Sequence, residues 1–456
     1  MAESKAMERL EKLLDEGSFI ELGASVSARS TDFSLKHPSE PSDGVITGYG
    51  QIEGIPVFVY SQNRDVLNGT MGEMHAKKIA DLYDKAMRSR APVIGLLDCG
   101  GFRLEESVDA LDGFGRVLAK QMECFGRLLT VSGVFGVCAG GMTLIPALSD
   151  FTFMSASADM FVNAPHTIRD NAVMAREFSS AVYQNTVSGQ AEVLETEDEV
   201  IGRIRLLVSL FEDSEYGSCD MEELNRHIPF GTGTEHVNTR AMLRECGDFR
   251  EFFEIRPDYC PEMVTGFLRL NGILTGVVGN AQAVFDGQGN IEQELPKGLT
   301  AGGCGKAAEF LSFCSKMSVP VLTVAAADGF AAQEETERSL PAALTRMMRA
   351  LAELSGARVN LIVGDTYGSA YVAMNTKPQK NGSCLTLAWD SVKVGMMEAE
   401  KAANILFSGN PERDAQAAAY EARQNSVRSA AAHGLIDSVI EPKDTRKHLI
   451  MAFSML

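Results

Sequence analysis

The sequence predicts an α/β fold made of two similar halves, and three observations support this prediction. Short apolar runs that suit buried strands alternate along the chain with longer stretches that have helical spacing. Several segments of the first half recur in the second half in the same order. The chain has 456 residues, 45% hydrophobic and 23% charged, which is a globular composition and a length suited to two large domains.

The elements of the first half follow from the spacing of its apolar residues. Met7, Leu10, Leu13 and Leu14 recur at helical spacing before Gly17, which predicts a helix that ends at this glycine. Two β-rich runs meet at Glu53-Gly54 and predict a hairpin. The expected strands are 45–52, 55–61, 93–97 and 129–135, and the further helices are 72–89, 105–125 and 139–148.

The second half has the same plan. Its predicted strands are 264–270, 273–278, 321–325 and 359–363, and its predicted helices are 302–316, 335–354 and 368–374. Polar and glycine-rich residues at 219–239 predict a linker, so we expect an N-terminal domain at 1–225 and a C-terminal domain at 240–456. The alanine-rich, charged stretch 411–428 predicts a surface helix.

A constant offset relates the two halves. The segment from Pro92 to Phe102 resembles the segment from Pro320 to Phe330, 228 positions later. The same offset relates Lys78 to Lys306, Ala80 to Ala308, Gly136 to Gly364 and Gly140 to Gly368. Thr47-Gly48 matches Thr265-Gly266 at an offset of 218, so the extra residues of the second half are expected within 286–298. Because the matching segments occur in the same order in both halves, they indicate an internal duplication.

Charge and cysteine content exclude several classes of protein. Lys plus Arg number 42 and Asp plus Glu number 61, which gives a net charge of -19 and disfavours nucleic acid as a partner. The nine cysteines form no Cys-x-x-Cys pair, so we expect neither a disulfide framework nor a metal site, and a reducing, cytoplasmic location. The uncharged run 128–149 contains Gly133, Gly136, Gly140, Gly141 and Pro146 and is read as a buried strand, turn and helix.

The most informative elements are two glycine turns in each half, each of which follows a buried strand. They are Asp98-Cys-Gly-Gly-Phe102, Cys138-Ala-Gly-Gly-Met142, Asp328-Gly-Phe330 and Asp365-Thr-Tyr-Gly-Ser-Ala370. A strand that ends in glycine and opens a helix presents free backbone N–H groups. Such groups can bind phosphate or stabilise an oxyanion that develops on a thioester or a urea. None of the turns matches a nucleotide-binding glycine motif.

These turns coincide with a family pattern. The chain resembles the carboxyltransferase subunits of biotin-dependent acyl-CoA carboxylases and decarboxylases, of the propionyl-CoA carboxylase β and methylmalonyl-CoA decarboxylase α type. The resemblance runs from about Leu10 to the end of the sequence. The residues that carry it are Asp43-Gly-Val-Ile-Thr-Gly-Tyr-Gly50, Gly72-Glu-Met-His-Ala-Lys-Lys-Ile79, Ala91-Pro-Val-Ile-Gly95, Cys138-Ala-Gly-Gly141, Tyr367-Gly-Ser-Ala-Tyr371 and Gly434-Leu-Ile-Asp437.

The resemblance implies a fold and an activity. The fold is two tandem crotonase-like (ClpP/crotonase) domains built from repeated β-β-α units. The activity is transfer of a carboxyl group between biotin on a separate carrier protein and the α-carbon of a short acyl-CoA, with propionyl-CoA and methylmalonyl-CoA as the best-matching pair. The first domain would take the acyl-CoA and the second the biotin, and each would stabilise one oxyanion.

The resemblance also implies partners. They are a biotin carboxyl carrier protein and either a biotin carboxylase or a membrane sodium-pump decarboxylase subunit, through which the chain would associate with the membrane. A homo-oligomer is expected, with a hexamer as the family's form and a cleft between the first domain of one subunit and the second domain of another. The chain contains no Ala/Val-Met-Lys-Met biotinylation sequence, so biotin would come on another chain.

The site residues are assigned by the resemblance. Gly140 and Gly141 are expected to form the hole for the acyl-CoA enolate, and Ser369 and Ala370 the hole on the biotin side. The residues expected to flank these two sites and bind the substrates are Gly100, Gly101, Phe102, Gly329, Phe330, Gly368 and Val372. No metal ligand is assigned, and no four-Cys zinc ribbon precedes the first half, which disfavours the acetyl-CoA version of the activity.

Three departures from the family pattern leave alternatives open. The family has a second glycine where Ser369 stands, often an acidic residue where Val372 stands, and a Pro-Gly-Phe-Leu-Pro-Gly loop where this chain has Ala327–Ala332. One alternative is a crotonase-like acyl-CoA enzyme that works without biotin in the first half. Another is a catalytically silent scaffold subunit of a carboxylase or decarboxylase complex.

Several polar residues near the motifs are read as structural. His75 is expected to pack in a helix, and Lys77 and Lys78 to lie on a solvated helix face. Glu105-Glu106 is read as the acidic start of a helix, where negative charge is favourable.

Overall fold

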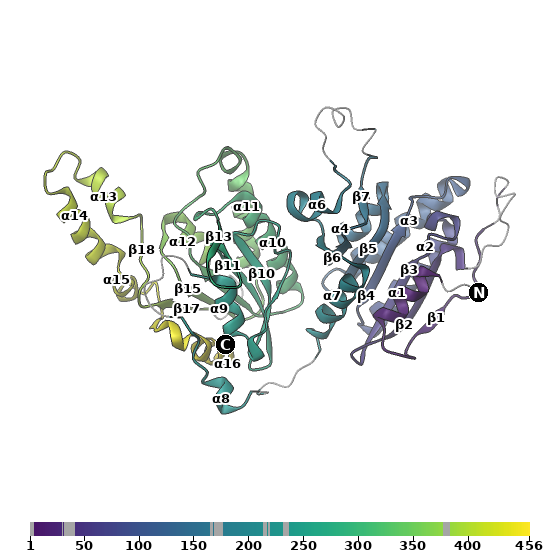
Figure 1. Ribbon diagram of the computed structural model, residues 1–456, viewed down its shortest axis with the longest axis horizontal. Helices are drawn as coiled ribbons and strands as arrows, with labels where there is room; N and C mark the ends of the chain where they lie inside the picture. The colour runs from purple at the N-terminus through teal and green to yellow at the C-terminus, as the bar shows by residue number, and fades with distance from the viewer. Residues whose placement is uncertain are drawn as a thin grey trace. The chain divides into compact units, whose positions relative to one another are not determined.

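The computed structural model describes residues 4–29, 31, 42–164, 167, 177–212, 217, 219–230, 237–376 and 384–456. The chain divides into two compact units, Met1–Glu212 and Asp213–Leu456. Each unit is built around one sheet with helices on it (Figure 1).

The sheet of the first unit has the order β1-β2-β3-β4-β5-β6-β8, with β7 paired to β5. The strands are β1 Ile20–Leu22, β2 Val45–Ile52, β3 Ile55–Gln62, β4 Val93–Cys99, β5 Thr130–Ala139, β6 Phe151–Ser155, β7 Asp159–Phe161 and β8 Glu192–Leu194. Strands β1 to β3 are antiparallel, and β3 to β8 run parallel. Strand β4 is buried along its whole length, as a continuous apolar run predicts.

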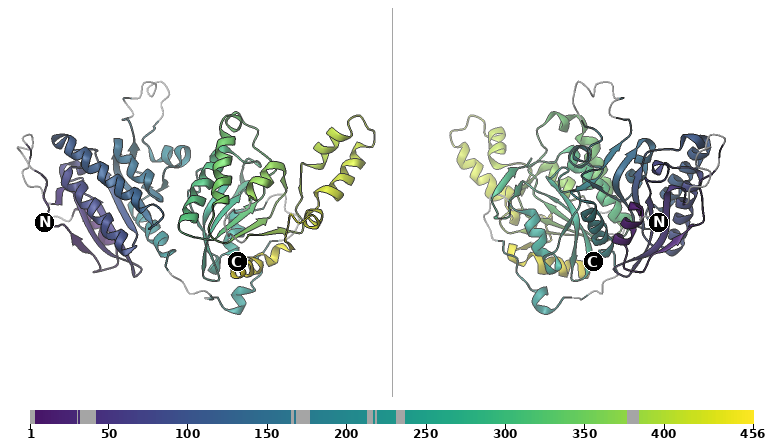
Figure 2. Two further views of the ribbon diagram at one scale, coloured as in Figure 1. Left: turned by 180° about the vertical axis from the view of Figure 1, so that it is seen from behind. Right: turned by 45° about the vertical axis from the view of Figure 1, so that its right-hand side comes forward.

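Helices cover both faces of this sheet, as the two opposite views in Figures 1 and 2 show. The helices are α1 Lys5–Leu13, α2 Glu73–Ser89, α3 Val108–Cys124, α4 Leu144–Leu148, α6 Ala181–Tyr183 and α7 Glu197–Ser209. Helix α2 packs beside α3, and α1 packs beside α7. The core between the sheet and α2 includes Tyr60, Ile79, Tyr83 and Leu97, all of them at most 2% exposed.

The second unit has the sheet order β19-β17-β15-β14-β11-β10-β9. The strands are β9 Phe253–Glu254, β10 Met263–Leu270, β11 Ile273–Asn280, β14 Val321–Ala325, β15 Arg358–Ile362, β17 Cys384–Trp389 and β19 Ser438–Ile440. Two small sheets accompany it, β12 Ala283–Phe285 with β13 Ile291–Glu294, and β16 Thr366–Tyr367 with β18 Val394–Gly395. Strand β13 lies within 286–298, where the extra residues of the second half were expected.

The helices of the second unit are α8 Met221–Leu224, α9 Thr239–Cys246, α10 Ala301–Lys316, α11 Glu334–Ala352, α12 Gly368–Met374, α13 Ala399–Leu406, α14 Arg413–Tyr420, α15 Val427–Ala432 and α16 Thr445–Met455. Helices α10 and α11 pack against each other, and α13 and α14 form an arm that projects from the unit (Figures 1 and 2). The predicted surface helix 411–428 is interrupted, because a π-helical turn, Glu421–Asn425, separates α14 from α15.

The duplication is confirmed by strand pairing. The hairpin β2–β3 corresponds to β10–β11, and each is followed by two parallel neighbours, β4 and β5 in one unit and β14 and β15 in the other. The matched threonines lie at the same place. Thr47 Oγ1 donates to Leu22 O at 2.7 Å, and Thr265 Oγ1 donates to Ile255 O at 3.1 Å.

The boundary between the units lies closer to the N-terminus than the expected linker. Residues 231–236 of that linker lie outside the described residues, but 219–228 pack on the second unit. The N–H of Cys219 donates to Asn271 Oδ1 at 3.2 Å, and the N–H of Ile228 donates to Lys443 O at 3.0 Å. A segment that was predicted to end the first domain therefore belongs to the second unit.

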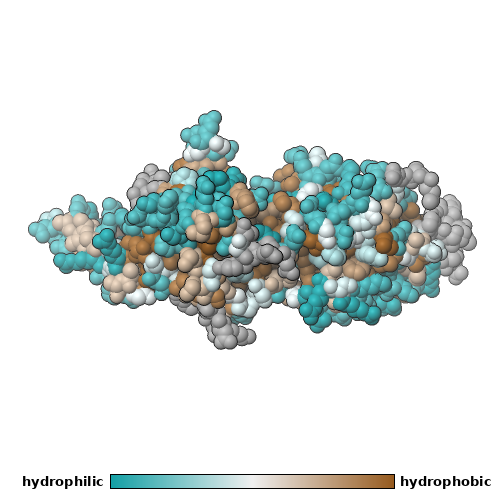
Figure 3. Space-filling view, turned by 90° about the horizontal axis from the view of Figure 1, so that it is seen from below, coloured by the Kyte–Doolittle hydropathy of each residue, from teal (hydrophilic) through white to brown (hydrophobic). Residues whose placement is uncertain are grey.

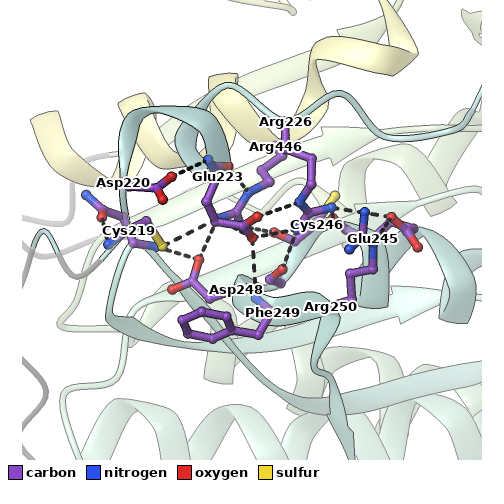
Figure 4. Close-up of polar contacts among 12 residues, drawn as sticks. Cys219, Asp220, Glu223, Arg226, Glu245, Cys246, Asp248, Phe249, Arg250 and Arg446 are labelled. Atoms are coloured by element: carbon purple, nitrogen blue, oxygen red, sulfur yellow. Dashed lines mark hydrogen bonds and ion pairs between the residues drawn. The ribbon is translucent and has the colours of Figure 1, made fainter.

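Arg446 on α16 completes this attachment (Figure 4). Its side chain is fully buried and donates to the carbonyl oxygens of Glu223, at 3.0 Å, and of Cys246, and to Asp248 Oδ1, at 2.7 Å. Asp248 also accepts the N–H groups of Asn271 and Gly272, at 2.9 and 2.8 Å. We call the bonds around Arg446 the C-terminal clasp.

Hydrophobic and hydrophilic residues are interspersed on the face seen in Figure 3. Across the part of the chain that the structure describes, no helix has the length and apolar character needed to cross a membrane. The run 128–149 forms β5, a 3₁₀ turn and α4, as the sequence predicts.

Candidate functional site

The four glycine turns lie at the carboxyl ends of parallel strands. In the first unit, β4 leads into Gly100–Phe102 and β5 leads into the 3₁₀ turn Gly140–Thr143 and then α4. In the second unit, β14 is followed by the turn at Asp328–Phe330, and β15 is followed by β16 and α12, which begins at Gly368. Because β4 and β5 are adjacent, as are β14 and β15, each unit brings its two turns to one edge of its sheet.

The two turns of one unit have the backbone conformation of the two turns in the other. Gly101 and Gly329 have φ values of +115° and +123°, and Gly140 and Gly368 have φ values of +64° and +58°. Each pair is 228 positions apart. Glycine adopts positive φ without steric cost, whereas a side chain would strain these positions. The duplication has therefore kept the shape of the turns as well as their glycines.

Phe102 and Phe330 are held in the same way. Met71 forms a bridge to Phe102, with its N–H on Gly101 O at 2.9 Å and its carbonyl accepting the N–H of Arg103 at 3.0 Å. Leu299 forms the corresponding bridge to Phe330, with bonds to Gly329 O at 2.9 Å and from the N–H of Ala331 at 3.0 Å.

The structure brings Gly141 and Phe102 together. A Cβ added at Gly141 would lie 2.9 Å from Cζ of Phe102, so the ring contacts the backbone of the turn. The Phe102 ring also packs edge-on against Phe114 of α3, with 4.8 Å between centroids. Position 141 therefore requires glycine for this close approach.

In the second unit a backbone bond joins the two turns. The N–H of Tyr367 donates to Ala327 O at 3.2 Å, which places Gly368 and Ser369 next to the Asp328–Phe330 turn. Phe330 is 43% exposed and Val372, on α12, is 56% exposed. The predicted donors are thus divided between the units, with Gly140 and Gly141 in the first and Ser369 and Ala370 in the second.

The turns lack side-chain caps, which several other helices of this chain have. Ser4, Thr196, Asp220, Asn238 and Thr300 cap their helices by accepting a backbone N–H. By contrast, the residues at the N-cap positions of the turns, Ala139 and Tyr367, form no side-chain cap bond. The first N–H groups of a helical turn have no carbonyl partner within it, so those of residues 140–141 and 369–370 are suited to an external acceptor.

Sequence reasoning missed a buried polar network beneath the turns of the first unit. Asp98 is 5% exposed, pairs with Arg9 Nη1 at 3.3 Å and accepts the N–H of Val137 at 3.3 Å. Its carboxylate fills the space above Gly136, where any Cβ would collide with it. The sequence signal that could have revealed this network is Asp98, a charged residue at the end of the apolar run 93–99.

Arg103 forms a second buried cluster beside the same turn. Its guanidinium contacts Asp43 and Glu106, and these three residues are 4%, 0% and 3% exposed. The prediction that Glu106 acts as the acidic start of a helix is wrong in this respect, because its carboxylate is buried against Arg103. Helix α3 begins later than expected, at Val108, since Ser107 has a φ of +46°.

His75 packs inside the first unit, as expected. Its ring is fully buried, with Nδ1 3.0 Å from Asp43 O and Nε2 3.3 Å from Gln62 Nε2. Burial, with the nearby charge of Arg103, lowers the pKa of His75 to about 3. A ring that stays neutral inside the core is a structural group.

The expectation that Lys78 is solvated is wrong. Its side chain is buried, and Nζ donates to the carbonyl oxygens of Val45 and Ser42 at 2.5 and 3.3 Å. Burial lowers the pKa of Lys78 to about 8. The amine holds the start of β2 and therefore does not face a ligand.

The two thiols beside the turns of the first unit are buried. Burial raises the pKa of Cys99 to about 11 and also raises the pKa of Cys138, so both thiols stay protonated at neutral pH. All nine cysteines are free thiols. Within the described ranges, no group of three His, Cys, Asp or Glu side chains could hold a metal ion.

Comparison with known proteins gives a consistent result. The carboxyl transferase domain family matches residues 2–456. A putative propionyl-CoA carboxylase beta chain of Bacillus subtilis is 35% identical over 472 residues, covering 99% of this chain and 90% of that protein. The methylmalonyl-CoA decarboxylase subunit alpha of Veillonella parvula is 31% identical, with coverage of 99% and 89%.

A solved structure agrees with these matches. The hexameric transcarboxylase 12S, solved with methylmalonyl-coenzyme A and methylmalonic acid bound, superposes with a TM-score of 0.87 at 29% identity. The match covers 99% of this chain and 89% of the transcarboxylase chain.

Proposed function

Because the chain belongs to the carboxyl transferase family, we propose that it moves a carboxyl group between carrier-bound biotin and the α-carbon of a short acyl-CoA. The family resemblance and the α/β fold with two tandem crotonase-like domains are confirmed, and the chain is an acyl-CoA carboxyltransferase. Propionyl-CoA and methylmalonyl-CoA are the proposed substrate pair. The names of the relatives from Bacillus subtilis and Veillonella parvula support this pair.

The observation that carries the proposal is the matched conformation of the glycine turns. Each unit has one uncapped helical turn opened by a glycine with positive φ, at Gly140 and at Gly368. Carboxyl transfer develops negative charge at two oxygens, one on each reactant, and each oxygen needs its own fixed donors. A duplicated turn supplies two such sets.

On the acyl-CoA side, the N–H groups of Gly140 and Gly141 donate to the thioester oxygen as the enolate forms. Gly100, Gly101 and Phe102 line this site. The contact of Phe102 with Gly141 supports this assignment, because it fixes the turn from below and leaves the helix start open. Fixed donors need no reorganisation at the moment of reaction.

On the biotin side, Ser369 and Ala370 offer the corresponding donors. The assignment of these donors to biotin rests on the uncapped start of α12 and on the neighbouring turn at Gly329 and Phe330. A serine at 369 keeps its backbone N–H, so the departure from the family's glycine does not remove a donor. Gly368 has a positive φ that sets the direction of the turn, and we expect the exposed Val372 to contact the acyl group. The chemistry supplied by biotin is a ureido nitrogen that takes up or releases the carboxyl group.

The proposed partners follow from the same proposal. They are a biotin carboxyl carrier protein and either a biotin carboxylase or a membrane decarboxylase subunit, with the chain itself in the cytoplasm. A homo-oligomer is proposed, with a hexamer as the form to test. In support, the relatives are named as chains or subunits, and the transcarboxylase 12S structure is described as a hexamer assembly.

The test measures loss of carboxyl by mass spectrometry. Purified protein is incubated with methylmalonyl-CoA, malonyl-CoA or glutaconyl-CoA, with and without added biotin. Biotin-dependent loss, fastest from methylmalonyl-CoA, is the expected result. Loss that does not depend on biotin would favour a biotin-free crotonase-like activity, and no loss from any substrate would favour a silent scaffold.

A further inference from the structure

We propose that Arg103 is a positioning residue for the acyl-CoA site, holding the Gly100–Phe102 turn and, through Phe102, the Gly140–Gly141 turn. This inference rests on the proposed function, because that function supplies the reaction whose rate Arg103 would affect. Arg103 follows Phe102 directly, and its side chain turns away from the proposed donors into the protein, where it is 4% exposed.

The guanidinium ties the turn to two distant segments and to Glu106, three residues further along the chain. Nη1 donates to Asp43 and, at 2.8 Å, to Oε1 of Glu106, while Nη2 donates to Thr70 O at 2.7 Å. Thr70 precedes Met71, whose backbone holds Phe102 on both sides. The residue after Phe102 is therefore fixed by its backbone and by its side chain to the same segment.

The two carboxylates extend this hold to the start of α2. Asp43 Oδ2 accepts the N–H of His75 at 2.7 Å, and Glu106 Oε2 accepts the N–H of Glu73 at 2.6 Å. The N-cap residue of α2 is Gly72, which offers no capping side chain, and a Cβ there would collide with Arg103 Nη1. The same two carboxylates thus cap α2 through one oxygen each and hold Arg103 through the other.

The second unit builds the same elements without this cluster. The position 228 residues after Arg103 is Ala331, and the helix that corresponds to α2 is α10. Helix α10 is capped by its own Thr300, whose Oγ1 accepts the N–H of Gly303 at 3.0 Å. The fold itself therefore needs no guanidinium at this place. The charged cluster of the first unit indicates that its turn must meet a further requirement.

The requirement is that the Gly100–Phe102 turn be held accurately in position. Phe102 contacts the backbone of Gly141, so a shift of the Phe102 turn moves the surface on which the proposed donors rest. A displacement of about 1 Å at reacting groups can reduce turnover about 100-fold. A lysine at position 103 keeps the charge but cannot bridge Asp43, Glu106 and Thr70 in the planar geometry of a guanidinium.

The experiment compares Arg103→Lys with the matched control Arg446→Lys. Both variants replace a buried arginine that pairs with a buried aspartate, but Arg446 belongs to the C-terminal clasp of the second unit. For biotin-dependent loss of carboxyl from methylmalonyl-CoA, we expect Arg103→Lys to lower kcat about 100-fold and to leave KM within about threefold. Arg446→Lys is expected to keep the wild-type kcat, while lowering the melting temperature by at least as much as Arg103→Lys does.

A second readout does not depend on activity. Amide hydrogen exchange in residues 99–103 and 139–143 is expected to accelerate in Arg103→Lys and to stay unchanged in Arg446→Lys. Unchanged exchange in both segments, or a kcat no lower than that of the control, overturns the inference. If wild-type protein shows no turnover, the proposed function fails and the exchange result alone decides the role of Arg103.

Glu106→Gln covers the case in which Arg103→Lys does not fold. This variant keeps one oxygen as the acceptor for Glu73 and keeps the Arg103–Asp43 pair, but its amide NH2 cannot accept from Nη1, so that bond is lost. An intermediate loss of kcat with faster exchange in 99–103 supports the positioning role, and wild-type behaviour in both measurements contradicts it.

Discussion

Lys78 and Lys306 occupy matching positions in the two units, and each donates hydrogen bonds to two backbone carbonyl oxygens. Lys78 Nζ contacts Val45 O and Ser42 O, and Lys306 Nζ contacts Arg256 O and Tyr259 O at 2.8 and 2.7 Å. They are 6% and 1% exposed. Each amine joins a helix to the chain that leads into the first hairpin of its sheet, so the duplication has preserved a structural contact made by a charged group.

The Lys306 contact predicts a dependence of stability on alkaline pH. Burial lowers the pKa of Lys306 to about 8, from 10.5 for a free lysine. Between these values the unfolded chain binds more protons than the folded one, so this group's contribution to the free energy of unfolding rises with pH. We expect the stability difference between wild type and Lys306→Met to grow in favour of wild type from pH 8 to pH 10, by at most about 3 kcal/mol.

Trp389 provides the measurement. It is the single tryptophan of the chain and is 2% exposed in β17, so its fluorescence reports unfolding of the second unit. Urea unfolding is followed at several pH values under reducing conditions. Lys316→Met, at the end of the same helix, is the control, and an equal pH profile for both variants would contradict the prediction.

His75 predicts a pH dependence of the same sign, but at acidic pH. Its pKa is lowered to about 3 in the folded protein, whereas an unfolded histidine titrates near 6.5. As pH falls below 6.5 the unfolded chain takes up a proton that the folded chain does not, so stability decreases. The difference between wild type and His75→Gln should shrink by about 2 kcal/mol between pH 6.5 and pH 4.5.

Amide exchange of α2 measures this effect, because the first unit contains no tryptophan. His433→Gln, which changes an exposed histidine of the second unit, serves as the control. A constant difference between wild type and His75→Gln across this pH range would show that His75 accepts a proton in the folded state.

Gly140→Ala tests the turn of the acyl-CoA site. No atom lies within 4 Å of a Cβ at this position, but the φ of +64° strains any side chain. Relief of the strain would rotate the N–H groups, and loss of one donor lowers turnover by about 10²–10³-fold. Gly409→Ala is the matched control, since Gly409 has a φ of +78° and equally open surroundings in the second unit. Equal activity of the two variants would show that Gly140 does not contribute to the acyl-CoA site.

Ser369→Pro tests the donor on the biotin side. Proline is tolerated in the first turn of a helix and removes the N–H. We expect transfer to biotin to fall by about 10²–10³-fold, and Ser369→Ala, which removes only the hydroxyl, to stay within about threefold of wild type. A proline variant with normal transfer, and normal melting temperature, would show that this N–H does not act as a donor.

The sequence predicts those features that depend on neighbouring residues. The hairpin of β2 and β3 was located to within one residue, because alternating β-rich runs flank Glu53-Gly54. Strand β5 was expected to end at Phe135 and continues to Ala139, since Asp98 fills the space above Gly136 and supports the extension. That contact joins residues far apart in the chain, so local patterns do not reveal it.

The same reason explains the error on Lys78. Lys78 looked like a surface residue because its acceptors, near Ser42, precede it by more than thirty residues. The duplication did contain a signal, because a lysine repeats in Lys306.

The C-terminal clasp also has a consequence for synthesis on the ribosome. Arg446 holds the carbonyl oxygens of Glu223 and Cys246 and the carboxylate of Asp248, which are translated some two hundred residues earlier. Until α16 has left the exit tunnel, these groups have no guanidinium partner, and the carboxylate of Asp248 must remain hydrated. The first unit can therefore complete its packing while the chain is still being made, whereas the second unit closes only after Arg446 has been translated and α16 has left the exit tunnel.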